Sequence, residues 1–390
     1  MDRAVPEPAN VKILIVSNYF YPEHIGGVEV VADNLATHYR RAGHEVRMVA
    51  ADVPPSFRRA QPGDVPLRAW NLAEARLGFP YPIPGPAALP ELWRQVDWCD
   101  VVHAHDSLYI SSALSCLMAR VRGRPVLITQ HAKIIAYEQR YRRWLQTIAY
   151  HSLGRFVLML AGQVIFVSAP VHDEMVRFVK PSQKARVVLN GVDTGFFAPL
   201  DSEARAGVRK RFGLEANKPL VLFVGRMVER KGVHLLRPII EAHGEWNWIL
   251  VGRQDDIDPG SWGLPNLLHL TPVSRETLRD LYAAADVLLH PSTGEGITLT
   301  AREAVSCGTP VILSAESLAS ARPEDNAAFI PAQRDSQSLE AALGRAHRAV
   351  NGGADTRLRL REHAVSTLSW EGVAAEYLKY LQVLHKGIPS

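Results

Sequence analysis

Residues 11–50 read VKILIVSNYFYPEHIGGVEVVADNLATHYRRAGHEVRMVA, and this stretch decides the fold. Residues 11–17 form a short apolar run that ends in a polar loop, which is typical of a buried parallel strand. A helical pattern follows over 28–41, and Gly43 stands just beyond it as a stop signal. Residues 45–50 predict a second strand. A strand, a helix and a strand with short connections form the unit of a parallel α/β sheet.

The same alternation continues through the first half of the chain and then starts again. In the first half, strands are predicted over 101–105, 125–129 and 164–167, with helices over 108–120 and 138–160. In the second half, strands are predicted over 220–225, 248–251, 267–270, 287–290 and 310–313, with helices between them. Two such successions predict two Rossmann-like, doubly wound domains. We expect an N-terminal domain over 1–195, a C-terminal domain over 196–369, and a last helix over 370–390 whose apolar face packs on another part of the chain. The proline-rich tract 79–90 is expected to be an ordered loop.

The composition suits a protein with ordinary globular cores. The chain has 390 residues, of which 47% are hydrophobic and 22% are charged, and its formal net charge is +4. This mild basicity suits anionic substrates or an anionic membrane surface, but no block of like charge is long enough to indicate nucleic-acid binding. Cys99, Cys116 and Cys307 show no disulfide or metal-ligand spacing, so free thiols in a reducing compartment are expected. Residues 1–10 lack the apolar region of a signal peptide, so a cytoplasmic location is expected.

The segment PSTGEGITLTAREAVSCGTPVI, residues 291–312, carries the clearest sign of chemistry. Glu295 stands in a glycine-containing loop, and Glu303 stands in the helix that we expect to follow. The steps between them span at most about 12 Å along a helix, so the two carboxylates can hold two hydroxyl-bearing parts of one extended ligand. Backbone N–H groups at 297–299 would form the helix N-terminus, which favours phosphate oxygens. Two solvated glutamates at this spacing are the plain alternative.

Two further loops place charge or glycine beside expected strand ends. In the sequence VGRMVERKG, Gly225 ends a strand, Arg226 follows it and Lys231 comes just before the next helix. Ligands of open α/β sheets bind at the carboxyl ends of the strands, where Arg clamps phosphate and Lys adds a point charge. In the first loop, Gly26 and Gly27 allow the backbone to approach an anion closely. Neither loop has the G-x-G-x-x-G pattern, which counts against a dehydrogenase.

Three other patterns leave alternatives open. His103 and His105 alternate on a strand and face one side, but no third metal ligand accompanies them, so packing is expected. The acidic run 255–258 follows a strand of the second half and is expected to be a solvated turn rather than a metal motif. The helix over 138–160 interleaves arginines with aromatic side chains, a stripe that either packs on its own domain or lies on an anionic bilayer. The most apolar stretch, 156–171, is too short to span a membrane.

Together these segments resemble glycosyltransferase family 4, the large retaining group with the GT-B fold. The resemblance covers nearly the whole chain, and the order and spacing of its landmarks carry it. The landmarks are Gly26, Gly27, the strand at 101–105, His131, the run Asn190-Gly191-Val192-Asp193, Arg226, Lys231, Glu295 and Glu303. The resemblance implies an α/β fold in which two Rossmann-like domains face a cleft, with the acceptor on the N-terminal side and the nucleotide sugar on the C-terminal side. It also implies that the C-terminal helix returns to the N-terminal domain.

The resemblance implies an activity and a role for each matching residue. The chain is expected to move a hexose from a nucleoside diphosphate sugar with retention of the anomeric configuration. Catalytic roles would fall to His131, Arg226, Lys231 and Glu295. Donor contacts would come from Gly26, Gly27, Gly225, Arg226, Lys231, Val273, Glu295, Gly296, Ile297, Thr298, Leu299 and Glu303. Arg226 and Lys231 would neutralise the diphosphate, so neither a metal nor a cofactor is expected; fixed positive groups aimed at developing negative charge are a large catalytic effect.

The finer roles follow the same resemblance. His131 would lie near the donor sugar, Glu295 would bind sugar hydroxyls and Glu303 would bind the ribose hydroxyls. The chain departs from the family at Thr298, where glycine is usual, and at Gln254 and Thr271, near the expected base. UDP-sugars are favoured as donors and GDP-sugars come next.

The acceptor and the cellular partners are less determined. A glycan, a lipid-linked sugar or a small molecule would each serve as acceptor, and association with the inner face of the cytoplasmic membrane is left open. Two other functions are weighed. A sugar-nucleotide epimerase of the same architecture would consume donor without any acceptor, and a non-catalytic nucleotide-sugar-binding protein would bind donor without turnover.

Overall fold

The chain folds into two compact units. The computed structural model describes residues 10–20, 27–52, 63–70, 82–132, 140–179, 185–215, 217–319, 327–351 and 355–387. Unit 1 comprises Met1–Leu189 and Val373–Ser390, and unit 2 comprises Asn190–Gly372. The expected boundaries at 195/196 and 369/370 stand a few residues away from these crossings. The two crossing segments are tied together inside unit 2, because the Val192 N–H donates to the Leu368 carbonyl at 2.7 Å and Val192 pairs with Ser369.

Unit 1 is built on an eight-stranded sheet in the order β4-β3-β2-β1-β5-β6-β7-β8. Its strands are β1 (Lys12–Val16), β2 (Glu45–Asp52), β3 (Asp64–Trp70), β4 (Ile83–Pro84), β5 (Val101–His105), β6 (Val126–Gln130), β7 (Gln163–Phe166) and β8 (Ala185–Val187). Its α-helices are α1 (Gly27–Arg41), α3 (Leu89–Trp98), α4 (Ile110–Val121), α5 (Arg140–Ala149), α6 (Arg155–Leu160), α7 (Ala169–Met175) and α15 (Trp370–Lys386), the last beginning within unit 2. The strands pair in parallel except β4, which is antiparallel to β3. Strands β5, β6 and β7 are buried along their whole length, as the apolar runs predict.

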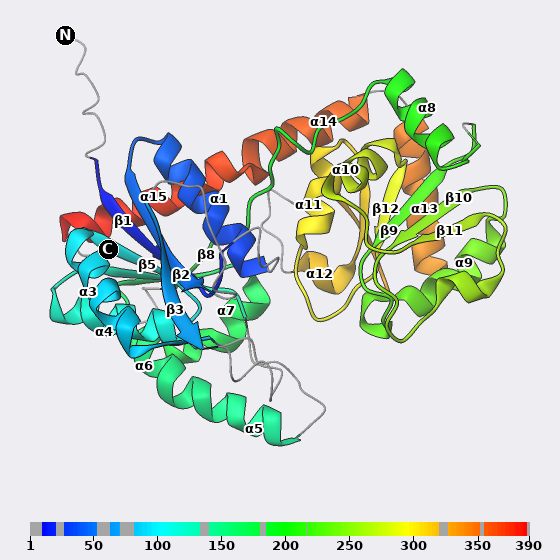
Figure 1. Ribbon diagram of the computed structural model, residues 1–390. Coiled ribbons are helices and arrows are strands. Elements are labelled where there is room, and N and C mark those ends of the chain that lie inside the picture. Colours follow the sequence, from blue (N-terminus) through cyan, green and yellow to red (C-terminus); the bar gives the residue numbers. More distant parts are fainter. Residues whose placement is uncertain are drawn as a thin grey trace, which may run out of the picture. The chain divides into compact units, whose positions relative to one another are not determined.

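Unit 2 is built on a six-stranded parallel sheet in the order β11-β10-β9-β12-β13-β14. Its strands are β9 (Leu220–Val224), β10 (Asn247–Val251), β11 (Leu267–Leu270), β12 (Val287–His290), β13 (Val311–Ser314) and β14 (Phe329–Ala332). Its helices are α8 (Ser202–Arg211), α9 (Leu236–Ala242), α10 (Arg275–Ala284), α11 (Leu299–Ser306), α12 (Ala315–Ala319), α13 (Ser336–Asn351) and α14 (Asp355–His363). Helices cover both faces of this sheet (Figure 1). Leu222 packs in the core layer that contains Leu281 of α10, whereas its neighbour Phe223 packs in the layer that contains Leu339 of α13.

The two doubly wound α/β units confirm the predicted fold class. The final helix α15 also returns to unit 1 as expected, because Tyr377 is buried there and accepts a hydrogen bond from the Thr129 hydroxyl at 3.4 Å. Several elements were not predicted, among them β3, β4, α3 and α7 in unit 1 and α8, β14, α13 and α14 in unit 2. The tract 79–90, expected to be a loop, therefore contains β4 and the start of α3, with the remainder up to residue 81 outside the described residues.

Each sheet reverses its strand order at one point. In unit 1 the chain lays down β1 to β4 on one side and β5 to β8 on the other, so the reversal falls between β1 and β5. In unit 2 it falls between β9 and β12. Open α/β sheets bind ligands outside the carboxyl ends of the strands at such points. We therefore expect ligands at the loops that follow β9 and β12 in unit 2, and at those that follow β1 and β5 in unit 1.

Candidate active site

The loops that follow β9 and β12 in unit 2 pack directly against each other. Gly232 adopts a left-handed φ of 77°, and a Cβ atom there would lie 2.5 Å from the Pro291 carbonyl oxygen. The Arg334 Nε donates to that same carbonyl at 3.0 Å, and its Nη2 donates to the Glu229 carbonyl at 3.4 Å. Only glycine allows both the left-handed backbone and this close approach. The two loops that carry most of the predicted site residues are therefore held together.

Lys231 and Glu295, predicted from separate segments, form an ion pair across these two loops. The Lys231 Nζ donates to the Glu295 Oε1 at 2.6 Å, and the two side chains are 14% and 22% exposed. Burial alone would raise the pKa of Glu295, but the charge and hydrogen bond of Lys231, helped by His290, lower it below its ordinary value. Glu295 is therefore an ionised acceptor whose position is fixed by a cation.

His290, the last residue of β12, lies close enough to this ion pair to interact with both of its charges. Its side chain is buried, and the pKa of its imidazole is lowered to about 4 by burial and then by the charge of Lys231. His290 is therefore neutral at physiological pH. Its Nε2 lies 3.4 Å from the Thr298 hydroxyl, which links the end of the strand to the start of α11. Sequence reasoning missed His290, although its place after an apolar run and before the glycine-containing loop was a signal.

Thr298 begins helix α11 as its N-cap. Its hydroxyl accepts from the Ala301 N–H at 3.3 Å, a normal use of threonine at this position. The N–H groups of Leu299 and Thr300 also lie in the first turn, where no intrahelical acceptor exists. The helix therefore presents N–H donors and the positive end of its dipole beside Gly296 and Ile297, a setting that favours an anion.

The loop between β12 and Glu295 is fixed by a carboxylate from the neighbouring helix. Glu316 of α12 accepts from the Thr293 hydroxyl and, at 3.0 Å, from the Gly294 N–H. Gly294 has a φ of 73°, which a side-chain-bearing residue would adopt only at a cost. Sequence reasoning missed Glu316, because nothing in its local pattern distinguishes it from a solvated glutamate.

A cavity of about 400 Å³ lies at the carboxyl ends of β9 and β10. Its lining residues are Val224, Gly225, Arg226, Val251, Gly252, Arg253, Pro272, Val273 and Leu278. Of the predicted donor contacts, Gly225, Arg226 and Val273 are therefore brought together here, whereas Gln254 and Thr271 are not among the lining residues. Arg226 is about half exposed, and its guanidinium lies 3.6 Å from Asp255.

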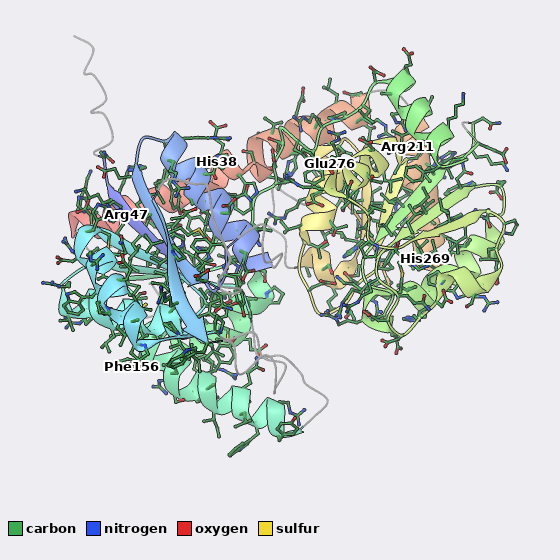
Figure 2. All side chains as sticks on the ribbon, in the orientation of Figure 1. His38, Arg47, Phe156, Arg211, His269 and Glu276 are labelled. Atoms are coloured by element: carbon green, nitrogen blue, oxygen red, sulfur yellow. The ribbon has the colours of Figure 1, made fainter. Side chains whose placement is uncertain are left out.

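Gly252 lines this cavity and lies very close to the backbone of Gly225. Its φ is 152°, and a Cβ atom would lie only 1.8 Å from the Gly225 carbonyl oxygen. His269, which is labelled in Figure 2, donates from Nε2 to the Gly252 carbonyl at 3.3 Å. Sequence reasoning missed Gly252, since the contact depends on two strands meeting rather than on a local motif.

The acidic run 255–258 has specific partners. Asp255 pairs with Arg253 at 2.7 Å as well as with Arg226, and Asp258 accepts from the Gly260 N–H at 3.0 Å to start a short 3-10 helix. Among the described residues, no three His, Cys, Asp or Glu side chains are close enough to hold a metal ion.

Glu303 is the fifth residue of α11 and lies in a different environment from Glu295. Burial raises the pKa of its carboxyl to about 7, although the nearby Tyr282 hydroxyl and the charge of Arg275 act to lower it. Tyr282 itself is fully buried. Glu303 is therefore poised to change its protonation state when a ligand offers it hydrogen-bond donors.

In unit 1, His131 follows β6 and meets His105 at the end of β5. The His105 Nδ1 and the His131 Nε2 are 2.9 Å apart, and the two rings stack with centroids 5.1 Å apart. Burial lowers the pKa of His131 to about 3. Burial, with His103 and His131 as neighbours, also lowers the pKa of His105 well below its ordinary value. The His103 ring stacks on His105 and its Nε2 lies 2.8 Å from the Thr129 hydroxyl, so His103 packs within the fold.

The glycine loop of unit 1 is only partly described. Gly26 lies outside the described residues, and Gly27 is the first residue of α1, with open space where a side chain would stand. Glu29 lies in the first turn of the same helix and is buried.

Comparisons with known proteins agree with this arrangement. The family described as Glycosyltransferase Family 4 matches residues 25–196, and the family described as Glycosyl transferases group 1 matches residues 218–348. An uncharacterized glycosyltransferase of Methanocaldococcus jannaschii is 26% identical over 78% of this chain and 80% of its own length. A GDP-mannose:cellobiosyl-diphosphopolyprenol alpha-mannosyltransferase of Xanthomonas oryzae pv. oryzae is 26% identical over 97% of this chain and 98% of its own length. The structure of sucrose-phosphate synthase from Thermosynechococcus elongatus superposes with a TM-score of 0.72 at 22% identity, covering 97% of this chain and all of that chain.

The two α/β units have the fold of the GT-B class, and the two family matches show that the chain is a glycosyltransferase. Within that class, the chain belongs to glycosyltransferase family 4.

Proposed function

We propose that this glycosyltransferase transfers a hexose from a nucleoside diphosphate sugar with retention of the anomeric configuration. The observation that carries the proposal is the Lys231–Glu295 pair, which stands beside the N-terminus of α11 at the point where the sheet of unit 2 reverses. Glu295, being ionised, accepts hydrogen bonds from hydroxyls of the donor sugar. Lys231 and the first-turn N–H groups of α11 meet the diphosphate.

In this proposal the enzyme accelerates departure of the nucleoside diphosphate. As the bond between the anomeric carbon and the diphosphate oxygen breaks, negative charge grows on the leaving group and positive charge grows on the sugar. Lys231, Arg226 and the α11 dipole stabilise the former, and they are in place before the reaction begins. Because these groups supply the positive charge, we propose that no metal ion is required.

The same proposal assigns the rest of the donor. The cavity beside Gly225 and Val273 takes the nucleobase, since its walls are strand ends with apolar side chains. Glu303 takes the ribose hydroxyls.

The name of one relative supports a revised order of the proposed donors and acceptors. The relative that spans 97% of this chain is named for GDP-mannose and for a diphosphopolyprenol-linked acceptor. We therefore place GDP-mannose ahead of UDP-sugars as donor, and a polyprenyl-diphosphate-linked saccharide first among acceptors.

A transfer assay tests this function. The purified full chain is incubated with GDP-mannose or UDP-glucose and a polyprenyl-diphosphate-linked saccharide, with and without a metal chelator. The proposal predicts release of one nucleoside diphosphate and a product whose new linkage keeps the α configuration of the donor, as read by nuclear magnetic resonance. An inverted linkage would contradict the retaining mechanism, and loss of turnover with the chelator would contradict the metal-free one.

We further propose that unit 1 associates with anionic lipid through α5 and α6. An apolar face of this segment is exposed, with Phe156 labelled on it in Figure 2. Its members are Tyr141, Trp144, Leu145, Ile148, Phe156 and Met159, between 44% and 63% exposed. The sequence holds arginines at 140, 142, 143 and 155 and no Asp or Glu from residue 139 to residue 172. A helix with exposed aromatic side chains, and with basic but no acidic residues around them, favours the surface of an anionic bilayer. No helix in the described ranges is long and apolar enough to cross one.

Vesicle sedimentation tests this association. The full chain should sediment with phosphatidylglycerol vesicles more than with phosphatidylcholine vesicles, and added salt should weaken the binding. Trp144→Glu with Ile148→Glu should release the protein, whereas Leu358→Glu, at a similarly exposed apolar position in unit 2, should not. Equal sedimentation of all three proteins would reject this surface.

A further inference from the structure

The contact between His105 and His131 requires one specific arrangement of protons. The His105 Nδ1 and the His131 Nε2 are 2.9 Å apart, which is hydrogen-bond distance. Both imidazoles are neutral, because burial lowers their pKa values far below neutrality. A neutral imidazole has one N–H and one bare nitrogen, so only one of the two facing nitrogens carries a proton. The two rings therefore fix each other's tautomer.

The other ring nitrogen of His105 decides which of the two facing nitrogens carries the proton. Its Nε2 is buried and has no hydrogen-bond partner among the described residues. If His131 donated, His105 would carry its proton on this Nε2, as a buried N–H without an acceptor. Orphaned buried N–H groups are rarer in proteins than acceptors with unused lone pairs. The arrangement with the bare Nε2 is therefore favoured, and in it the His105 Nδ1–H donates to His131.

The backbone of His131 is held independently of its ring. Asp106, which follows β5, accepts from the N–H groups of His131 and Ala132 at 3.1 and 3.3 Å through Oδ1. The same oxygen accepts from the Gln130 Nε2 at 2.6 Å. Asp106 adopts a φ of 58°, an uncommon value for a residue with a side chain. Such conformations persist where the surroundings impose them, often at functional sites.

We propose that His105 is a positioning residue that fixes His131 as the Nδ1–H tautomer, so that His131 offers a bound sugar a hydrogen-bond donor. His105 donates a hydrogen bond to the Nε2 of the His131 ring, and Asp106 accepts one from the backbone N–H of His131. The identity of the ligand as a sugar rests on the proposed function, whereas the tautomer does not. His131 then recognises an oxygen with an available lone pair and carries no charge near neutral pH.

Nitrogen resonance measures the tautomer directly. The full chain is labelled with ¹⁵N-histidine, and the signals of His131 are identified by their loss in His131→Gln. We expect the Nδ1 of His131 at a protonated-type shift and its Nε2 at a bare-type shift near neutral pH, without any ligand. The opposite assignment would overturn the proposal, and so would a charged ring with both nitrogens protonated. This readout stands even if no transfer activity is found.

Two substitutions test the consequence for catalysis. The amide of His105→Asn can donate from about the position of Nδ1, whereas His105→Leu removes the donor and keeps an apolar side chain. We expect His105→Asn to keep kcat within about threefold of the wild type and His105→Leu to lower it about tenfold, the effect of one neutral hydrogen bond. A role in packing alone would favour Leu over Asn, so the reverse order would reject the positioning role. If neither variant folds, the resonance measurement on the wild type still decides.

Discussion

Two glutamates of one segment are held in different states by their neighbours. Glu295 is kept ionised by Lys231 at 2.6 Å, in spite of its burial. No Lys or Arg within the described ranges forms a salt bridge with Glu303, and burial brings the pKa of its carboxyl to about 7. The first is therefore a fixed acceptor, and the second is one whose charge depends on pH and on what binds to it.

The pH dependence of donor binding tests the role of Glu303. Ribose hydroxyls donate to a carboxylate, so binding selects the ionised form and releases a proton when Glu303 starts protonated. Affinity should therefore rise with pH up to about 7 and level off above it, a gain of about tenfold between pH 6 and pH 8. The measurement is titration calorimetry with a nucleotide sugar, whose diphosphate does not ionise in this range. Glu303→Gln should bind more weakly with little pH dependence; an unchanged pH slope in this variant would exclude Glu303 as its cause.

The departure at Thr298 has a structural explanation. Where the resembling family usually has glycine, this threonine caps α11 by accepting from the Ala301 N–H. The cap leaves the N–H groups of the first turn before Ala301 directed out of the helix. The side chain thus replaces glycine without covering the first-turn N–H groups of α11, where we propose that the diphosphate binds.

At the scale of elements, the hydrophobic pattern of the sequence predicted the buried strands but did not predict β3, near the edge of the sheet in unit 1. Strands β6 and β10 are buried at every position, so each appears in the sequence as a mostly apolar run. β3 has one buried residue, Leu67, and contains Pro66 and Arg68, so no apolar run or clean alternation marks it. It becomes a strand because β2 offers it a partner in register.

Sequence patterns predicted those site residues whose role follows from the chemistry of the side chain. Lys231 was chosen as a cation at the opening of an expected helix and Glu295 as a carboxylate in a glycine-containing loop, and the structure joins them. Gly252 and Asp106 could not be chosen in this way, because their roles depend on backbone conformation and on approaches between separate strands. These contacts exist only once the sheets have formed.

Gly252→Ala tests whether the approach of β9 and β10 depends on glycine. A Cβ atom would lie 1.8 Å from the Gly225 carbonyl oxygen, so the two loops must move apart. We expect a loss of about 3 kcal/mol and a fall in the melting temperature of unit 2 of about 6–12 °C, measured by scanning calorimetry. Gly207→Ala is the matched control, because it adds a methyl group to α8 in open space and should be neutral or stabilising. Equal melting temperatures for the two variants would refute the close approach.

At the scale of the whole molecule, the chain crosses between its units twice and finishes where it began. Residues 190–193 leave unit 1, and α15 carries the chain back to it. Tyr377 of α15 is buried in unit 1, where its ring stacks on His103 and its hydroxyl meets Thr129. The last helix thus packs on His103, whose ring in turn stacks on His105, and both ends of the sequence belong to the same unit.

Binding of a nucleotide sugar to unit 2 is the most direct test of the central claim. The full chain is titrated with GDP-mannose, and in parallel with UDP-glucose, by calorimetry in the presence of a metal chelator. We predict one site per chain that is weakened about 30-fold or more by Lys231→Ala, since a buried cation paired with Glu295 is lost. Lys218→Ala, which removes a lysine paired with Glu215 elsewhere in unit 2, should bind as the wild type does. Absence of binding by any nucleotide sugar, or equal affinity in the two variants, would contradict the assignment of Lys231 and Glu295 to the donor.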